Sequence, residues 1–372
     1  MRPEPRHVAT RRTRRHFLRG GALFGGGLLL GGAGALIGPR AVPGAGGGAQ
    51  VGPLVPVAPP VAEPNLRVAA RPRRLAEGDL VRLVSPAGPP DAGLVGIGVS
   101  LLESWGLRVE VSEHALESDG YLSAPDADRL DDLNAALNDP DVRAVIATRG
   151  GYGVQRIVDG VDFDAVGADP KLVVGYSDIT ALHTALWQRA SVTSLHAPMA
   201  AWHGELNTGA TEKSLRDALM TTKDVRLERD PDEPTASVRA NGKVSGRLLG
   251  GNLSTLVAER EAWPDLTGAI LFVEDVGEEP YRIDAMLTEM LRAGVLDRVA
   301  GVAVGQFYEC VGGQGNWSAA DVLTDRLGEL GVPMAGGFPV GHGHGPRAMP
   351  LGTQAELDGK AGTLTVEAAV IE

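Results

Sequence analysis

The sequence has 372 residues with a formal net charge of −12, and 43% of its residues are hydrophobic. A chain of this length can form two domains with substantial cores, and its hydrophobic fraction excludes a largely disordered protein. The single cysteine, Cys310, excludes a disulfide framework, a zinc–cysteine cluster and a paired redox motif.

Residues 1–45 differ from the rest of the chain. They contain Thr-Arg-Arg-His-Phe-Leu at 13–18, followed by a glycine-rich, weakly apolar stretch at 20–37, which is the pattern of a twin-arginine export signal. The alternatives are a basic nucleic-acid-binding arm and a membrane anchor, but the glycine content disfavours a membrane-spanning helix. We therefore expect export by the twin-arginine route to the periplasm or the exterior, and no integral membrane span in the mature protein.

The charge of the chain changes when this segment is left out. The remainder holds 27 basic and 46 acidic residues, a formal balance of −19. A surface this acidic repels phosphate backbones and anionic lipids, so we expect no nucleic-acid partner. A well-solvated surface is the alternative explanation of the acidity.

Composition divides the rest of the chain. Residues 46–65 are rich in glycine, proline and alanine and are expected to form a linker. A polar stretch with two prolines at 230–241 is expected to link an N-terminal α/β domain at 66–229 to a smaller C-terminal domain at 242–372.

The N-terminal part is predicted to alternate between strands and helices. In chain order we expect a strand at 79–85, a helix ending near 105, a strand at 107–111, a helix at 127–137, a strand at 142–148, and a strand from 172 followed by a helix from 178. This alternation is typical of a parallel, doubly wound sheet, whose ligand crevice lies beyond the carboxyl ends of the strands. Ser85, the glycines of 150–153 and Ser177 should then share one edge.

The C-terminal part is predicted to be richer in strands. We expect strands at 243–249, 269–273, 299–307, 354–357 and 363–366, and helices from 253 to about 260, at 283–293 and at 319–330. The sequence contains no internal repeat.

Ser177 lies on the expected turn between a strand and a helix. Its hydroxyl would be exposed at the carboxyl end of the sheet, beside backbone N–H groups that open the helix, as suits a nucleophile. The alternative is that Ser177 or Asp178 caps the helix, since both residue types are common N-caps. The Gly-x-Ser-x-Gly elbow of α/β-hydrolases is not completed, because Ile179 stands at its last position.

A glycine loop, Arg149–Gly153, follows the strand at 142–148. Glycines let backbone N–H groups approach a ligand closely, as in a phosphate site or an oxyanion hole. The dinucleotide fingerprint and the Walker lysine pattern are both absent, which weakens the phosphate interpretation. A tight strand-to-helix turn is the alternative.

Carboxylates and histidines could complete a site. Glu274 and Asp275 end an apolar strand and could face the crevice or belong to an ordinary acidic turn. His342 and His344 lie among glycines, where little apolar surface can bury an imidazole. A zinc site would need a third ligand that the sequence does not mark, so we expect no metal and no cofactor.

Five motifs together resemble, in order and spacing, the LD-carboxypeptidase family of serine peptidases, which also contains microcin-immunity hydrolases. The resemblance extends from about 79 to 366. The motifs are Arg149–Gly153, Gly175–His183, Gly250–Leu253, Phe272–Asp275 and Pro339–His344.

The resemblance implies a flavodoxin-like N-terminal domain, a smaller β-rich α/β C-terminal domain and a homodimer. It assigns the nucleophile to Ser177, the acidic member to Glu274 and the base to His342. His342 is preferred over His344 because it directly follows the Pro-Val-Gly segment. The oxyanion hole would use the backbone N–H groups of Gly151 and Asp178.

The expected function is release of the terminal D-amino acid from murein tetrapeptides by acyl-enzyme catalysis. Two alternatives remain open. An immunity-type hydrolase would act on aminoacyl-nucleotide antibiotics, and an exported binding protein would close on a ligand without turnover.

Overall fold

The computed structural model describes residues 68–201, 209–312 and 315–372. The predicted export signal at 1–45 and the predicted linker at 46–65 lie outside these residues. Within the described ranges, no helix is both long and apolar enough to cross a bilayer.

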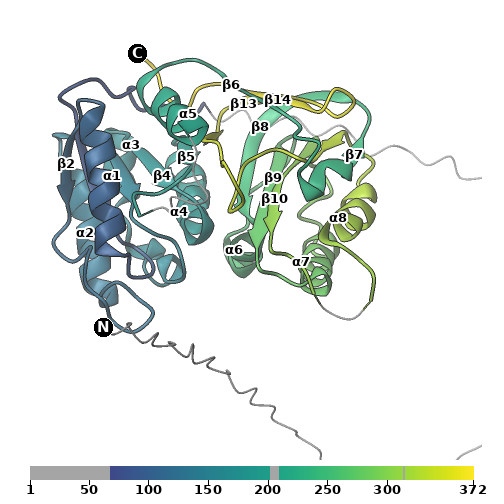
Figure 1. Ribbon diagram of the computed structural model, residues 1–372, viewed down its shortest axis with the longest axis horizontal. Coiled ribbons are helices and arrows are strands. Elements are labelled where there is room, and N and C mark those ends of the chain that lie inside the picture. Colours follow the sequence, from purple (N-terminus) through teal and green to yellow (C-terminus); the bar gives the residue numbers. More distant parts are fainter. Residues whose placement is uncertain (1–67, 202–208, 313–314) are drawn as a thin grey trace, which may run out of the picture. The chain divides into compact units, whose positions relative to one another are not determined.

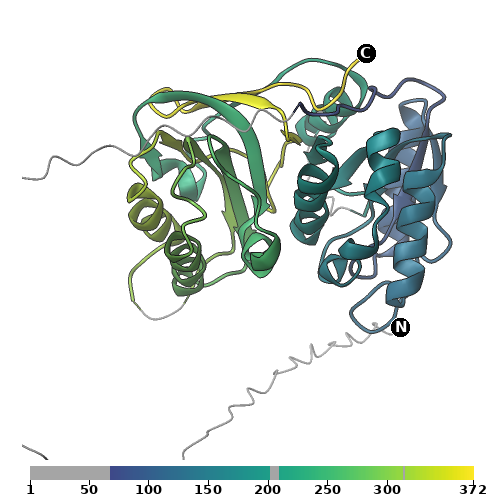
Figure 2. The same ribbon diagram turned by 180° about the vertical axis from the view of Figure 1, so that it is seen from behind.

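The described residues form two sheets, and the first has six strands. They are β1 (Leu80–Val84), β2 (Arg108–Val111), β3 (Val142–Ala147), β4 (Leu172–Gly175), β5 (Ser194–His196) and β12 (Met349–Leu351). Figure 1 labels β2, β4 and β5 of this sheet, and Figure 2 shows the same sheet from behind. The spatial order is β12-β5-β4-β3-β1-β2, and all neighbours pair in parallel except β12 with β5. The parallel order 2-1-3-4-5 is the flavodoxin-like order, which confirms the expected class of this part of the chain.

Helices cover both faces of the first sheet, because its central strands are apolar on both sides. The helices are α1 (Ala92–Ser104), α2 (Asp126–Asn138), α3 (Phe163–Ala168), α4 (Thr180–Ala185) and α5 (Gly209–Met220). Side chains of α1 and α5 pack on one face with Val81 and Leu83 of β1. Side chains of α2, α3 and α4 pack on the other face with Val145 of β3 and Val173 of β4.

The second sheet has eight strands. They are β6 (Val225–Glu228), β7 (Arg239–Ala240), β8 (Lys243–Asn252), β9 (Ile270–Val276), β10 (Gly301–Tyr308), β11 (Met334–Ala335), β13 (Gln354–Asp358) and β14 (Thr363–Val366). Strands β8 to β11 pair in parallel, and the outer strands β6, β14, β13 and β7 are antiparallel to their neighbours. The confirmed class is therefore a parallel α/β sheet joined to a β-rich α/β part.

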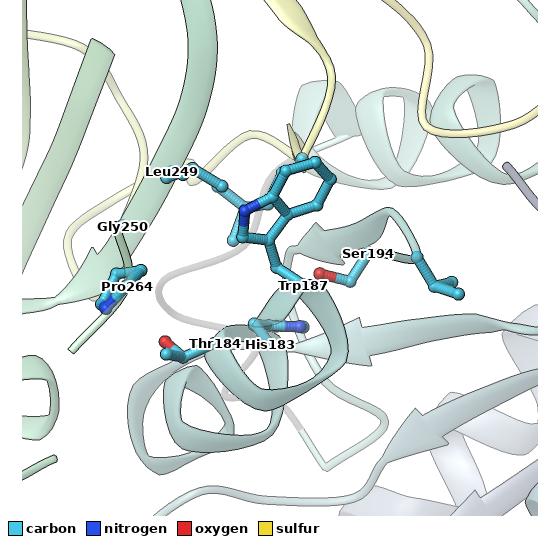
Figure 3. A pocket seen from close by; sticks show the side chains of 10 residues that line it. His183, Thr184, Trp187, Ser194, Leu249, Gly250 and Pro264 are labelled. Atoms are coloured by element: carbon cyan, nitrogen blue, oxygen red, sulfur yellow. The ribbon is translucent and has the colours of Figure 1, made fainter. Parts of the chain in front are cut away.

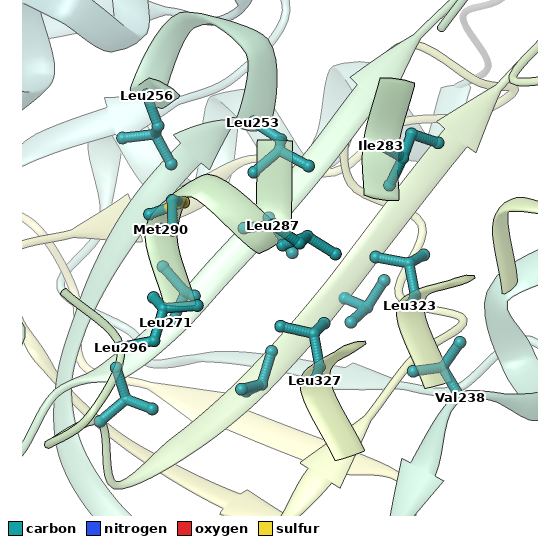
Figure 4. Packing of buried hydrophobic residues seen from close by; sticks show 14 of the residues in the cluster. Val238, Leu253, Leu256, Leu271, Ile283, Leu287, Met290, Leu296, Leu323 and Leu327 are labelled. Atoms are coloured by element: carbon teal, nitrogen blue, oxygen red, sulfur yellow. The ribbon is translucent and has the colours of Figure 1, made fainter. Parts of the chain in front are cut away.

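Three helices cover one face of the second sheet: α6 (Leu253–Ala258), α7 (Pro280–Arg292) and α8 (Ala319–Gly328). Figure 4 shows leucines, an isoleucine and a methionine of these helices packed on Leu271 of β9. On the opposite face, Phe272, Phe338 and Val340 form a separate cluster with side chains of the outer strands. Glu274 follows Phe272 by two residues in β9, so the two side chains face the same side of the sheet.

Each part of the chain contributes a strand to the sheet of the other part. Strand β6 precedes the expected linker at 230–241 yet pairs with β14 in the second sheet, and β7 lies inside that stretch. In the other direction, β12 comes from the C-terminal part and closes the first sheet against β5. After β14, Ala368–Val370 pack into the core beneath α1 and α5.

Some local structure differs from the sequence-based expectation. The helix after Ser177 is divided into a 3₁₀ turn at Ser177–Ile179, the α-helix α4 and a π-helical turn at Leu186–Ala190. Strand β9 continues through both carboxylates to Val276 instead of stopping before them. The short strands β5 and β12 have too few residues to show a period of two in the sequence.

Candidate active site

A cavity of about 440 Å³ opens at the carboxyl end of the first sheet. The loops after β1 and β3 border it, as expected at the switch point of a flavodoxin-like sheet. Its lining combines residues of both parts of the chain: Asp91, Leu94, Arg149, Gly150, Gly151, Tyr176, Ser177, Met199, Ala201, Val276, His342, Gly343 and Pro346. Ser177 and His342, predicted from segments far apart in sequence, therefore face the same space.

Ser177 sits on a strained turn. Its φ is 63°, a left-handed conformation that costs a residue with a β-carbon about 1–2 kcal/mol. Gly150 packs so tightly on this turn that a β-carbon there would lie 2.8 Å from that of Ser177. The fold thus forces a half-buried serine hydroxyl toward the cavity, and Ser177 Oγ makes no hydrogen bond to any described residue.

Asp178 has a different structural role from the one expected. Neither the 3₁₀ turn nor α4 has a side-chain cap. The Asp178 carboxylate instead accepts a hydrogen bond of 2.9 Å from the backbone N–H of Val154, just after the glycine loop. Burial raises the pKa of Asp178, and the N–H groups of Val154 and Gly153 oppose that rise. Asp178 therefore ties the serine turn to the glycine loop.

The two predicted oxyanion donors are placed differently. Gly151 lines the cavity, and Asp178 does not. The backbone N–H groups of both residues donate to no other described residue.

Glu274 lies in the middle of the second sheet and is fully buried. Its Oε2 lies 2.7 Å from His342 Nδ1. Gly341 makes this contact possible, because it has a φ of 134° and a β-carbon there would lie 2.7 Å from Glu274 Oε2. The short, charge-assisted contact fixes the orientation of the His342 ring.

A bulge in β10 positions the histidine loop. Gly305 and Gln306 lie opposite Glu274 where the register between β9 and β10 shifts. The Gln306 side chain accepts from the N–H of Gly343 at 2.9 Å, and it donates to the carbonyl of His344 at 3.0 Å and to Glu233 at 2.6 Å. Gln306 therefore fixes the loop at Gly343 and His344, directly after His342. Bulges commonly orient side chains near active sites.

The electrostatics around His342 favour its charged form. Burial, the largest influence, lowers the pKa of His342, but the charge and hydrogen bond of Glu274, together with Asp275, raise it above its ordinary value. The ring of Tyr176 lies 4.6 Å from that of His342 between centroids, and burial, then Glu274, raises the pKa of Tyr176 to about 12. Tyr176 thus stays neutral beside the imidazole.

His344 occupies a different position. It is exposed and packs edge-on against Tyr308, with ring centroids 5.8 Å apart, and it does not line the cavity. Of the two histidines, only His342 contacts Glu274.

Asp275 is part of the scaffold. Its carboxylate accepts from the Asn252 side chain at 3.0 Å and from the N–H groups of Ser254 and Val276 at 2.8 Å, which holds the start of α6. Burial, then Glu274, raises the pKa of Asp275 to about 6. Across the described residues, no cluster of three or more His, Cys, Asp or Glu side chains is arranged to hold a metal ion.

Arg149 adds a cation to the cavity wall, a role that its place in the glycine loop does not reveal in the sequence. It is exposed, and its guanidinium donates to the carbonyl of Pro89 at 2.7 Å, which leaves other N–H groups unused. Gln306 and Tyr176 were also missed. A polar residue within the apolar run of β10 was the available signal for Gln306.

The cavity brings together Ser177, the backbone of Gly151 and a histidine that is bonded to a buried carboxylate. Such an arrangement can carry out nucleophilic acyl transfer. No hydrogen bond joins Ser177 to His342 in this structure; such contacts often tighten only with substrate bound.

Comparisons with known proteins identify the family of this chain. Residues 81–197 match the LD-carboxypeptidase N-terminal domain, and residues 245–357 match the LD-carboxypeptidase C-terminal domain. The chain belongs to the LD-carboxypeptidase family.

Individual relatives cover most of the chain. A Streptomyces coelicolor protein named as a carboxypeptidase is 42% identical over 309 residues, or 81% of this chain and 97% of the relative. The murein tetrapeptide carboxypeptidase of Pseudomonas aeruginosa is 29% identical, covering 75% and 93%. The crystal structure of muramoyltetrapeptide carboxypeptidase from Oxalobacter formigenes superposes with a TM-score of 0.70 at 26% identity, covering 78% and 100%. The family and these names support a peptidase.

Proposed function

We propose that this protein is a serine-type LD-carboxypeptidase that releases the terminal D-alanine from murein tetrapeptide stems. The observation that carries the proposal is that Ser177, on a strained turn, opens onto the same cavity as His342, whose Nδ1 is bonded to a buried carboxylate at 2.7 Å. The name of the P. aeruginosa relative supports the substrate class.

In the proposed reaction, His342 Nε2 takes the Ser177 proton as the hydroxyl attacks the amide carbonyl. Glu274 holds the proton on Nδ1 and stabilises the imidazolium that forms. Backbone N–H groups of Gly151 and Asp178 would stabilise the oxyanion, at about 3 kcal/mol per donor. His342 then protonates the leaving D-amino acid, and water hydrolyses the acyl-enzyme.

A carboxypeptidase must also recognise a free carboxylate. Arg149 fits this role, because its backbone is joined to Gly150, which packs on Ser177, and its guanidinium is held at the cavity wall by Pro89. A guanidinium can bind a carboxylate with two parallel hydrogen bonds.

The decisive experiment is incubation of the purified protein with murein tetrapeptide, followed by mass analysis. We expect free D-alanine and the tripeptide from the wild type and from Ser100→Ala, a control on an exposed face of α1, and neither product from Ser177→Ala. Full activity in Ser177→Ala would show that Ser177 is not the nucleophile.

Two other outcomes would identify a different function. Hydrolysis of an aminoacyl sulfamoyl adenylate with no turnover of muropeptide would indicate an immunity-type hydrolase. Tight binding of a ligand without turnover, and no labelling of Ser177 by a fluorophosphonate, would indicate a binding protein.

We also propose export through residues 1–45 by the twin-arginine route, which would bring the enzyme to the cell wall. Replacing both Arg14 and Arg15 by lysine should retain the protein in the cytoplasm. Secretion unaffected by that change would contradict the proposed route.

A further inference from the structure

A second histidine lies beside the free oxygen of Glu274. His196, the last residue of β5, is 1% exposed, and its Nε2 lies 3.8 Å from Glu274 Oε1. Neither ring nitrogen of His196 has a hydrogen-bond partner, and neither does Oε1. Glu274 therefore meets one histidine with each carboxylate oxygen.

The His196 ring is held from several sides. It packs edge-on against Phe272 at 5.2 Å and Tyr176 at 5.9 Å between ring centroids. The backbone of His196 pairs with Gly175 in β4 and with Met349 in β12. A residue paired on both sides cannot move away from Glu274 without disrupting the sheet.

The surroundings of His196 favour its neutral form. The titratable side chains that face it are His183 on α4, Tyr176 after β4, Glu274 on β9 and His342 in the loop after β11. Burial, then the charges of His183 and His342, holds the pKa of His196 well below its usual range. A neutral imidazole carries a single N–H, so its tautomer decides what it can contact.

His183 is already engaged elsewhere. Its Nε2 lies 2.9 Å from the carbonyl of Gly175, which fixes the proton on that nitrogen. Figure 3 shows His183 with Thr184, Trp187 and Leu249 around a separate cavity of about 10 Å³, near the lower limit for one water. Of these two histidines, His196 is therefore the one whose Nε2 can direct an N–H at Glu274 Oε1.

A buried carboxylate oxygen without a donor is costly. At 3.8 Å an N–H directed at this oxygen forms no hydrogen bond, but its dipole lowers that cost. We propose that His196 is a positioning residue, which keeps its proton on Nε2 directed at Glu274 Oε1 and so holds Oε2 toward His342. This inference rests on the proposed function for its catalytic consequence but not for its tautomer.

The tautomer can be measured without a substrate. In protein labelled with ¹⁵N-histidine, the His196 ring is assigned by the signals lost in His196→Gln. We expect a neutral ring with its proton on Nε2 at every pH from about 5.5 to 8, protected from exchange with water. A proton on Nδ1, or a ring that titrates within this range, would overturn the proposal.

Kinetics test the positioning role. His196→Phe keeps a ring of similar size but no donor, whereas the amide of His196→Gln can donate from the place of Nε2. We expect His196→Phe to lower kcat by about 10–100-fold with KM changed by less than about threefold, and His196→Gln to recover most of the loss. The acid limb of the pH profile should move to higher pH in His196→Phe. Without an N–H directed at Oε1, the Glu274 carboxylate stabilises the protonated form of His342 more strongly and so raises the pKa of His342.

Equal losses in both variants, or full activity in His196→Phe, would overturn the proposal. Melting temperatures show whether each variant folds, and if His196→Phe does not, the tautomer measurement and His196→Gln decide. A wild-type protein inactive on muropeptide would refute the proposed function, while the tautomer would still decide the role of His196.

Discussion

Glu274 Oε2 lies 2.7 Å from His342 Nδ1, although 68 positions separate the two residues in the chain. The carboxylate comes from the centre of a sheet and is fully buried, and the histidine comes from a glycine-rich loop that reaches the cavity. The pair places a buried carboxylate beside the imidazole, where a positive charge develops in the proposed reaction when the serine proton is transferred.

This contact predicts the pH dependence of activity. In the proposed mechanism His342 must be neutral to accept the Ser177 proton, and the pKa of His342 lies above its ordinary value of 6.5. Activity should therefore rise with pH through an acid limb whose midpoint lies above 6.5 in kcat/KM. Initial rates of D-alanine release between pH 5 and 9 test this, and a midpoint below 6.5 would contradict it.

Glu274→Gln should lower kcat by about 10⁴-fold, because the neutral amide no longer fixes the tautomer or stabilises the imidazolium. Its acid limb should move to lower pH, since burial still lowers the pKa of His342 and the opposing charge is gone. Full pH profiles of both proteins give the comparison. Unchanged profiles would remove Glu274 from the mechanism.

Gln306→Leu should reduce both stability and activity. It leaves the N–H of Gly343 without its acceptor in a buried place, at about 1–3 kcal/mol, and frees the loop that carries His342. We expect a melting temperature a few degrees lower and a kcat reduced by about tenfold. Gln354→Leu, at an exposed position of β13, is the matched control. Identical behaviour of the two variants would show that Gln306 does not hold the loop that carries His342.

Arg149→Gln should change the preference between substrates. If Arg149 binds the terminal carboxylate, kcat/KM for the free acid should fall by about 10–100-fold, while the already slow reaction of the C-terminal amide should stay the same. Arg143→Gln is the control, because Arg143 lies in β3, before the loop that carries Arg149, and does not line the cavity. Equal losses on acid and amide would show that Arg149 does not read the carboxylate.

Cys310 should be unreactive in the folded protein. It is 3% exposed, and burial raises its pKa to about 12, so the thiolate fraction at pH 8 is about 10⁻⁴. A disulfide reagent should label it only after denaturation, when one thiol per chain should appear. Rapid labelling of the native protein would contradict this.

The sequence predicts the regular elements well where the hydrophobic pattern is long. The strands at β1, β3, β9 and β10 and the helices at α2, α7 and α8 all occur close to their expected ranges. These segments pack in cores that depend mainly on their own apolar periodicity, which the sequence displays directly.

What the sequence could not predict depends on contacts between distant segments. The local sequence indicates that Asp178 caps a helix. In the structure, its carboxylate instead accepts a hydrogen bond from the N–H of Val154, which follows the glycine loop. His196 lies on a three-residue strand, and its relation to Glu274 exists only because the two sheets meet. Such positions show no local periodicity, so the sequence alone treats them as ordinary residues.

Strand β12 also determines when the first sheet can be completed during folding. Its three residues, which come late in the chain, cover the outer side of β5 in the sheet that bears Ser177. A fragment ending near 229 would have every predicted residue of the serine turn but would expose the edge of β5, an open template for pairing with other chains. The sheet that bears Ser177 is therefore completed only after residues 349–351 have emerged from the ribosome. Splitting the chain between its two parts should produce aggregates instead of two independent domains.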